Sequence, residues 1–523
     1  MAGSDGPVGL LPPPEPRERE GARESNAKLR ASSALVAVPV APPRENGESP
    51  TTVAASRLAE AAAAIGDQLT LPNVVEPPPE TKPAKSEPKT IAIPPIGTAT
   101  LEENIGWLAA RIVDAQKPLR VLNSLRWDSR VDEALARGKF KDLPAVGPSD
   151  YADLGFDAIA RINECEAIAR DVETRLGEGH PIGSILIATA LDYRDVIRML
   201  LARGTPDFYV YSRRLYGSPK DRLPHGKTVR DVCSEIYGRL GAVGKSILGP
   251  EDPRDIPADE AAAILDRRLR EYFVGSQVAV QIDDSIAADA AAGSDYVKLR
   301  SGARFSQRDI DILEVHEGWV HLATSLNGQS QPVARWLSKG PPRTIAVQEG
   351  LAALVELFTF RSSPRRARRI NDRVLAVDMA EDGASFADVF EWFRTAGYTE
   401  EDCVFHTRRV FRGGTLAGGA PFTKDALYGK GILLNYAFVY AAIHANRPEL
   451  IPYLFVGKVA HEDVPVLYEH STAHGGFVAP PVYVPPMFRD RSGLATWIVY
   501  SDFLSGVDGG EIIRYFDGLV SRE

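Results

Sequence analysis

The sequence predicts a mainly α-helical protein with a small β component, an α+β fold. From Thr100 to about Gly275, apolar residues recur at spacings of three and four, as they do on the buried face of amphipathic helices. Short runs near 276–282 and 296–299 have the composition of strands. We find no internal repeat. The prediction is therefore a helical fold in which strands are a minor part.

The first fifth of the chain differs in composition from the rest. Of the 39 prolines, 17 lie in residues 1–97, and no aromatic residue precedes Trp107. Proline removes backbone donors, and a segment without aromatics has little apolar area to offset the entropy of ordering. We therefore expect residues 1–97 to be a disordered leader and linker ahead of one unit at 98–523. Within that unit, 98–275 is the helical part and 276–523 is the part that carries the site described below.

Local signals support the individual helices. Thr100 is suited to cap the helix that starts at 101, because its side-chain oxygen can accept a free amide of the first turn. Later segments repeat the helical periodicity, and Gly- and Pro-rich loops such as 474–486 interrupt them. The expected helices are 101–116, 157–176, 228–248, 306–326, 344–360, 386–395 and 424–443.

Composition excludes several classes of protein. The 61 basic and 70 acidic side chains give a net charge of −9 and a pI near 5.7, unlike most general nucleic-acid-binding proteins. Three scattered cysteines can form neither a disulfide framework nor a thiolate zinc site. No apolar run approaches the roughly 18 residues of a transmembrane helix, and the N-terminus lacks the pattern of a signal peptide. We expect a cytoplasmic protein with no nucleic-acid or membrane partner.

One short string is typical of a metal site. Residues 316–321 read His-Glu-Gly-Trp-Val-His, and the whole chain has nine histidines. The zinc-protease signal HExxH places two imidazoles one turn apart on a helix. Here the spacing is i to i+5, so about 140° separates the rings on a regular helix. A π-bulge, which Gly318 could favour by relaxing the backbone, would bring His316 and His321 together. The alternative is two solvent-facing histidines on an ordinary helix.

A third protein ligand is required, because catalytic zinc sites hold three side chains and leave one position for water. The segment 344–360 is almost wholly apolar and includes Glu349 and Glu356. A carboxylate on such a helix is costly to bury unless it is paired or bound to a metal. Gly350 removes a side chain where this helix and the histidine helix could approach closely. Glu349 and Glu356 lie seven apart on one face, so spacing alone leaves both open as the ligand.

These motifs resemble those of a known family. Residues 348–352 read Gln-Glu-Gly-Leu-Ala, the pentapeptide of the QEGLA-motif family, which is related to the microtubule-associated tyrosine carboxypeptidases. The stretches 409–414 and 422–428, with 212–219 upstream, also look like family segments. The resemblance covers roughly Thr100 to Ile513. It implies a zincin-like metallopeptidase in which the HExxxH helix packs on the QEGLA helix.

The resemblance also implies roles for individual residues. One Zn²⁺ would be held by His316, His321 and Glu349, with Glu317 as the general base in hydrolysis of a peptide bond. A carboxypeptidase acting on a peptide or protein C-terminus needs a cationic anchor for the terminal carboxylate. The candidates for substrate binding are Arg409, Arg412, Lys424 and Tyr428. Tyr428 and His406 are the two candidates for stabilising the oxyanion.

Two functions follow from these expectations. The first is a zinc-dependent metallopeptidase, most simply a carboxypeptidase. The alternative is a non-catalytic metal-binding regulatory protein that acts through partners. An Ala- and Arg-rich, Lys-poor composition is typical of prokaryotic proteins, so we do not carry a tubulin substrate or a tyrosine preference over from the family.

A basic run at 361–369 has two interpretations. It could bind nucleic acid or an acidic peptide, but a solvated helix terminus is the favoured interpretation, because cations are stabilised near helix C-termini. Another histidine pair, His470 and His474, precedes glycines and prolines that disfavour a helix, so we interpret it as part of a loop.

Overall fold

The structure is a computed structural model that describes residues 93–95, 97–224, 226–243, 252–284, 286 and 288–506. The chain divides into two compact units, Met1–Glu87 and Pro88–Glu523. The first unit, and with it most of the leader expected at 1–97, lies outside the described residues. The described part is mainly helical with small sheets, which confirms the predicted fold class.

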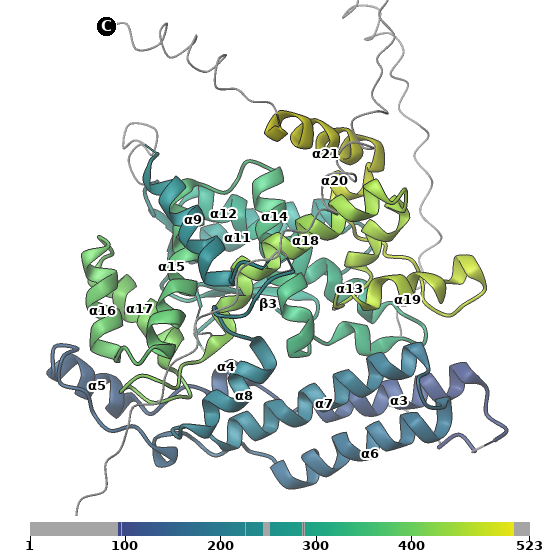
Figure 1. Cartoon of the computed structure of the whole chain (residues 1–523), viewed down its shortest axis with the longest axis horizontal. Coiled ribbons are helices and arrows are strands. Elements are labelled where there is room, and N and C mark those ends of the chain that lie inside the picture. Colours follow the sequence, from purple (N-terminus) through teal and green to yellow (C-terminus); the bar gives the residue numbers. More distant parts are fainter. Residues whose placement is uncertain are drawn as a thin grey trace, which may run out of the picture. The chain divides into compact units, whose positions relative to one another are not determined.

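The first described helices form a packed group along one side of the unit (Figure 1). Thr100 caps the first of them with a capping box, as expected. Here α3 contacts both α6 and α7, and α7 also packs on α8. We did not single out α7 from the sequence. The bounds of these helices are Leu101–Gln116 (α3), Val121–Ser124 (α4), Ser129–Arg137 (α5), Ala158–Leu176 (α6), Pro181–Leu201 (α7) and Asp207–Tyr216 (α8).

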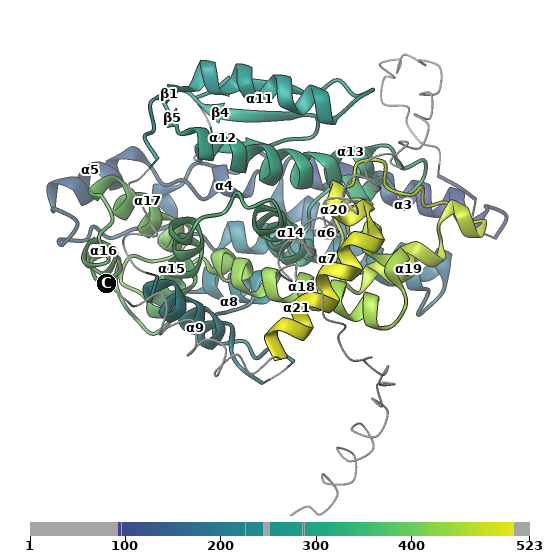
Figure 2. The same cartoon turned by 90° about the horizontal axis from the view of Figure 1, so that it is seen from above.

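Two small sheets lie beside α11 (Ala258–Tyr272), which Figure 2 shows together at one edge of the view. One has three strands in the order β2-β4-β3: β2 (Ala279–Asp283) runs parallel to β4 (Tyr296–Arg300), and β3 (Ala290–Ala292) runs antiparallel to it. The strands expected near 276–282 and 296–299 are thus confirmed. The other sheet pairs β1 (Ile256–Pro257) with β5 (Arg304–Phe305). These short strands, like the all-alanine β3, have too little pattern to be predicted.

The helices that carry the two motifs lie together in the described unit. The histidine motif lies on a continuous helical run of α12 (Gln307–Leu313), a π-helix (Glu314–Leu322) and α13 (Ala323–Gln329). The π-helix packs on α14 (Ile345–Phe358), as expected, and also on α11. In addition, α14 packs on α18 (Leu427–His444), the most extensive helix pairing of the described residues.

The remaining helices cover this centre (Figure 1). In particular, α15 contacts α9, α17 and α18, and α16 packs on α17. The helix expected at 386–395 is confirmed. The bounds are Val229–Gly241 (α9), Pro364–Glu381 (α15), Phe386–Thr395 (α16), Glu400–Phe411 (α17), Thr423–Ala426 (η5), Pro448–Phe455 (η6), Asp463–Glu469 (α19), Pro486–Arg489 (α20) and Arg491–Gly506 (α21).

One described helix has the length and composition of a membrane span. It is the run Thr423–His444, which comprises η5 and α18 and has a mean hydropathy of 1.2. Its packing gives another reason for this composition: α18 contacts α14, α15, α9 and η6. These contacts bury part of the helix, 39% of the apolar window, so packing against neighbouring helices accounts for a share of its apolar residues.

Candidate metal centre

A π-helix brings the two motif histidines together. The nine residues Glu314–Leu322 are π-helical, so the i to i+5 spacing is close to one turn. The ring centroids of His316 and His321 lie 4.9 Å apart, with the ring planes at 82°. The expected π distortion is confirmed, and two solvent-facing histidines are excluded because His316 is buried and His321 is partly buried.

Gly318 has a different role from the one expected. A Cβ at this position would lie 2.4 Å from Cδ2 of Leu269 on α11. The glycine therefore permits close contact between the π-helix and α11. Its backbone needs no special freedom, because φ is not in the left-handed region.

Donor atoms converge between the π-helix and α14. Nε2 of His316 and Nε2 of His321 each lie 3.8 Å from Oε2 of Glu349. Ligands about 2.1 Å from a tetrahedral ion are about 3.4 Å from one another, so this spacing fits one ion. Ligand atoms of His316, Glu317 and His321 also lie within 4.8 Å of one another. Two imidazoles and a carboxylate are a donor set that suits a catalytic zinc ion.

Hydrogen bonds orient both rings from behind. Nδ1 of His316 lies 2.7 Å from Oε1 of Glu356, and Nδ1 of His321 lies 3.4 Å from Oε1 of Gln348. Because both partners accept, each ring presents the lone pair of Nε2 toward Glu349. Metal-binding histidines almost always have such a partner for the other nitrogen. Glu349 and Glu356 therefore lie on one face, as expected, but contact opposite sides of His316.

Glu356, the hydrogen-bonding partner of His316, is itself paired with an arginine. Arg366 donates from Nε and Nη2 to the Glu356 carboxylate at 3.2 and 3.0 Å. Burial raises the pKa of Glu356, but the Arg366 charge and the His316 hydrogen bond outweigh it and lower the pKa to about 2. Arg366 belongs to the basic run at 361–369. The interpretation of that run as a solvated terminus is wrong at Arg366, because this residue lies in the first turn of α15 beside a fully buried acid.

Glu349 has a cationic partner of its own. Nζ of Lys424, on η5, donates to Oε1 of Glu349 at 2.8 Å. Burial would raise the pKa of Glu349, but Lys424 and the two histidines hold it well below its usual range. Burial lowers the pKa of His316, yet hydrogen bonds with Glu349 and Glu356 raise it to about 9. The carboxylates thus favour a cation at Nε2 of His316, and a metal ion bound there would take the place of the proton.

Glu317 points toward the neighbouring sheet. Its Oε2 accepts the backbone N–H of Ala292 on the edge strand β3 at 2.9 Å. This bond fixes the carboxylate beside the histidines. The strand that supplies the amide could not be predicted from its alanine sequence.

Lys458 is a second, partly buried lysine at the centre. Its Nζ donates to the backbone oxygen of His321 and to Oε1 of Gln348, at 2.9 and 2.8 Å. Burial lowers the pKa of Lys458 to about 7, against the opposing effect of Glu317 and Glu349. Nothing in the sequence around Lys458 indicates a place in the centre, because only folding brings it there.

The sequence can now be compared with known proteins. A family model described as microtubule-associated tyrosine carboxypeptidase matches residues 133–506. The chain belongs to this family. The match begins later than the resemblance inferred from the motifs, which extended back to Thr100. No curated protein matches the sequence. The chain is thus a tyrosine carboxypeptidase family member with an HExxxH group, His316, Glu317 and His321, that could hold a metal ion, which implies metallocarboxypeptidase activity.

In this family member, Gly350 permits a close helix contact, but with another partner than expected. A Cβ on Gly350 would lie 2.2 Å from the backbone carbon of Gly431 on α18. The expectation of a close approach is confirmed, and its assignment to the histidine helix is wrong. Asn435 joins the same contact by donating to the backbone oxygens of Val347 and Gly431. The contact fixes α14, and hence Glu349, against α18.

The cationic candidates differ in their surroundings. Arg409, on α17, donates from Nε and Nη2 to the buried Asp425 at 2.8 and 2.7 Å. Arg412 forms no side-chain hydrogen bond or ion pair with the described residues and lies over the ring of Phe422 at 5.2 Å. Burial, with the charge of Arg409, lowers the pKa of Arg412 to about 10. Arg373 of α15 has a similarly depressed pKa of about 10 and was missed from the sequence.

The two oxyanion candidates lie in different environments. Tyr428 is buried at the start of α18, with Nζ of Lys424 5.7 Å from the centre of its ring. His406 instead lies among the aromatic rings of Phe393 and Tyr398, and burial lowers its pKa to about 2. Its surroundings are those of a core histidine.

Proposed function

We propose that this chain is a zinc-dependent carboxypeptidase that hydrolyses the last peptide bond of a peptide or protein. The observation that carries the proposal is the convergence of His316, His321 and Glu349, each oriented by a second hydrogen-bonding partner. Metallocarboxypeptidase activity follows from the family; the zinc ion, the residue roles and the kind of substrate are our proposals.

His316, His321 and Glu349 would hold the ion. The donor set of two neutral imidazoles and one carboxylate matches catalytic zinc sites, whereas Mg²⁺ and Ca²⁺ prefer oxygen ligands. Lys424 neutralises the second oxygen of Glu349, which leaves Oε2 as the atom that faces the rings. When bound, zinc supplies Lewis acidity, which lowers the pKa of a coordinated water toward about 7.

Glu317 is the proposed general base. With Oε2 held by the Ala292 amide, its carboxylate takes a proton from the attacking water and later delivers it to the leaving amine. Tyr428 lies beside Lys424 and is the proposed donor to the developing oxyanion. Burial raises its pKa, which keeps the phenol protonated.

Arg412 is the proposed anchor for the terminal carboxylate. Arg409 and Lys424, the other candidates, already pair with Asp425 and Glu349. Arg412 forms no ion pair with the described residues, and a guanidinium can bind a carboxylate through two parallel hydrogen bonds. We assign Arg409 and Lys424 to orienting neighbouring groups.

The test separates metal binding from catalysis. Purified wild-type protein should contain about one zinc per chain by elemental analysis, and His316→Ala should lose it. Glu317→Gln should keep the zinc but reduce release of C-terminal residues by roughly 10²- to 10⁴-fold, because it removes the base without removing a ligand. Absence of stoichiometric zinc in the wild type would refute the proposal.

The Glu317→Gln variant also tests the non-catalytic alternative. If loss of the wild-type gene product has a cellular effect that Glu317→Gln restores fully, the protein acts as a metal-binding regulator. We further propose a reducing compartment, most simply the cytoplasm, because the three cysteines are free and buried. A panel of peptides with different C-terminal residues addresses the tyrosine preference named in the family description.

A further inference from the structure

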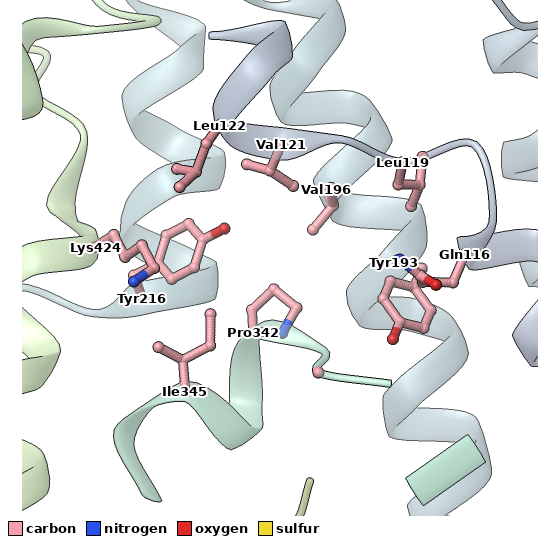
Figure 3. Close-up of a pocket in the computed structure, with 11 residues that line it drawn as sticks. Gln116, Leu119, Val121, Leu122, Tyr193, Val196, Tyr216, Pro342, Ile345 and Lys424 are labelled. Atoms are coloured by element: carbon pink, nitrogen blue, oxygen red, sulfur yellow. The ribbon is translucent and has the colours of Figure 1, made fainter. Parts of the chain in front are cut away.

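The metal centre has two lysines with different partners. Lys424, one of the residues that line the cavity in Figure 3, pairs with the carboxylate of Glu349. Lys458 reaches the centre from the segment just after η6 and forms no ion pair with the described residues. Its Nζ donates instead to two uncharged oxygens, those of the His321 backbone and the Gln348 side chain. A lysine that is partly buried without a carboxylate partner is unfavourable unless its hydrogen bonds serve another purpose.

The side-chain amide of Gln348 has a definite orientation in this arrangement. Its oxygen Oε1 lies 2.8 Å from Nζ of Lys458, 2.8 Å from Oγ1 of Thr324 on α13 and 3.4 Å from Nδ1 of His321. Its nitrogen Nε2 is buried and has no partner among the residues that the structure describes. A buried N–H group without an acceptor is costly. The hydrogen bonds of the amide nitrogen therefore do not explain the orientation.

The opposite orientation of the amide would suit two of its three neighbours. If the amide turned by half a rotation, its nitrogen would donate to Oγ1 of Thr324, whose hydroxyl could donate to the backbone oxygen of Val320, 2.8 Å away. The same nitrogen could donate to Nδ1 of His321, because a neutral imidazole has one donor and one acceptor nitrogen. The amide oxygen would then be the buried atom without a partner, which is less rare in proteins than an orphaned N–H. Neither Thr324 nor His321 therefore fixes the amide.

Lys458 is the neighbour that excludes the turned amide. A charged amine has three donors and no acceptor, so it requires an oxygen where Oε1 now lies. Even an uncharged amine keeps two N–H groups, one for each oxygen that Nζ contacts. The backbone holds the lysine in place, because the N–H of Lys458 donates to the oxygen of Leu337 at 2.7 Å. A Cβ on the preceding Gly457 would lie 2.6 Å from Cβ of Leu337, so the two segments are in close contact.

The orientation of the amide decides which nitrogen of His321 carries the ring proton. Burial lowers the pKa of His321 to about 4, so the ring is neutral at neutral pH and has a single proton. With the amide oxygen beside it, Nδ1 donates, and the lone pair of Nε2 faces Oε2 of Glu349. With the amide nitrogen there, Nδ1 would accept, and the proton would lie on Nε2. A histidine binds a metal only through an unprotonated nitrogen, so the turned amide would oppose metal binding.

We propose that Lys458 is a positioning residue of the metal centre: by donating to Oε1 of Gln348 it fixes the amide, and through the amide it keeps the ring proton of His321 on Nδ1. This inference rests on the proposed metallopeptidase function, in which His321 is a ligand. Lys458 acts through Gln348 and is not a ligand itself.

The test is a double-mutant cycle on Lys458 and Gln348, with zinc affinity measured by competition with a chelator. Lys458→Met removes the donors and should weaken zinc binding by about 10–100-fold, the usual effect of losing an outer partner of a metal ligand. A purely electrostatic effect has the opposite sign, because removal of a positive charge strengthens binding of a nearby cation. Gln348→Met should also weaken binding, since His321 loses its partner.

The combined variant Lys458→Met/Gln348→Met should bind zinc no more weakly than Gln348→Met alone, because no amide is left for Lys458 to orient. If Lys458→Met weakens binding equally in both backgrounds, the lysine acts through the backbone oxygen of His321 and the proposal is wrong. Unchanged or tighter binding in Lys458→Met alone would also overturn it. Lys220→Met is the matched control, because Lys220 is partly buried too but pairs with Glu381 and Asp382; it should leave the affinity unchanged.

A second variant and a second measurement keep the test independent of folding and of zinc. Lys458→Gln retains a polar side chain, but its amide can accept as well as donate, so it should weaken zinc binding in the same way. Thermal unfolding of the zinc-free proteins shows which variants fold. Nitrogen NMR of histidine-labelled, zinc-free protein should find the His321 ring proton on Nδ1 in the wild type and on Nε2 in the folded Lys458 variants. Wild-type protein that binds no zinc would refute the proposed function, whereas a ring proton that stays on Nδ1 in these variants would refute the role of Lys458.

Discussion

Two arginines three residues apart, Arg409 and Arg412, differ in whether a buried carboxylate pairs with them. Arg409 forms a bidentate pair with the buried Asp425, whereas the partly buried Arg412 has no carboxylate partner among the described residues. Both lie in a stretch that resembles the family, and the sequence treats them alike. Only the position of Asp425 in the fold distinguishes them.

We predict opposite effects for substitutions of these arginines. Arg412→Met should weaken binding of peptides with a free C-terminal carboxylate by about 1.5–3 kcal/mol, the value of hydrogen bonds to a charged group. KM should rise accordingly, and the preference for free over amidated C-termini should shrink. Steady-state kinetics with paired free and amidated peptides measure both.

Arg409→Met is the contrasting variant. It leaves Asp425 buried without its partner, which should lower the free energy of unfolding by about 3–5 kcal/mol in urea titrations. If Arg412→Met instead destabilises the fold and leaves the amide preference intact, the anchor assignment is wrong.

At the scale of elements, spacing predicted several helices and the π distortion but missed α7, and the family resemblance predicted only one helix contact, that of the π-helix with α14. The i to i+5 separation of His316 and His321 requires a wider turn if both bind one ion, and the structure has that turn. The partner of Gly350 was not predictable, because α14 and α18 are both apolar and periodicity does not indicate which helices meet. The same holds for Lys458 and β3, which reach the centre from distant parts of the chain.

The close contact of α14 with α18 gives a prediction for Gly350→Ala. The added Cβ would meet the backbone of Gly431, which cannot rotate away as a side chain can. We expect a loss of about 3 kcal/mol in the free energy of unfolding and weaker zinc binding, because Glu349 adjoins the contact. Thermal denaturation and metal titration measure the two effects.

Gly238→Ala provides the control within another helix. A Cβ there meets nothing within 4 Å, and alanine is a better helix former by about 0.5–1 kcal/mol. This variant should be neutral or slightly more stable. Equal stability of both variants would show that α14 and α18 are not in close contact.

At the scale of the whole molecule, composition predicted a boundary near residue 97, and the family match begins at 133. The structure shows why neither feature alone defines the folded unit. Helix α3 lies before the match, yet Ile105, Leu108 and Ile112 are fully buried in the same hydrophobic cluster as residues of α7 and α14. Pro94 also accepts a hydrogen bond from Arg175 at 2.9 Å. Packing therefore places the start of the required chain ahead of residue 100.

Two truncations test this boundary. Deleting residues 1–92 should leave zinc content, kcat/KM and the midpoint of thermal unfolding unchanged, because every proposed ligand, base and anchor lies beyond residue 300. Deleting residues 1–132, as the family match alone would suggest, removes α3 and α4. Loss of three fully buried aliphatic side chains, at about 1.5–3 kcal/mol each, approaches the 5–15 kcal/mol that stabilises a typical domain. This shorter chain should be largely unfolded by circular dichroism, and a stable, zinc-loaded product would show that α3 is dispensable.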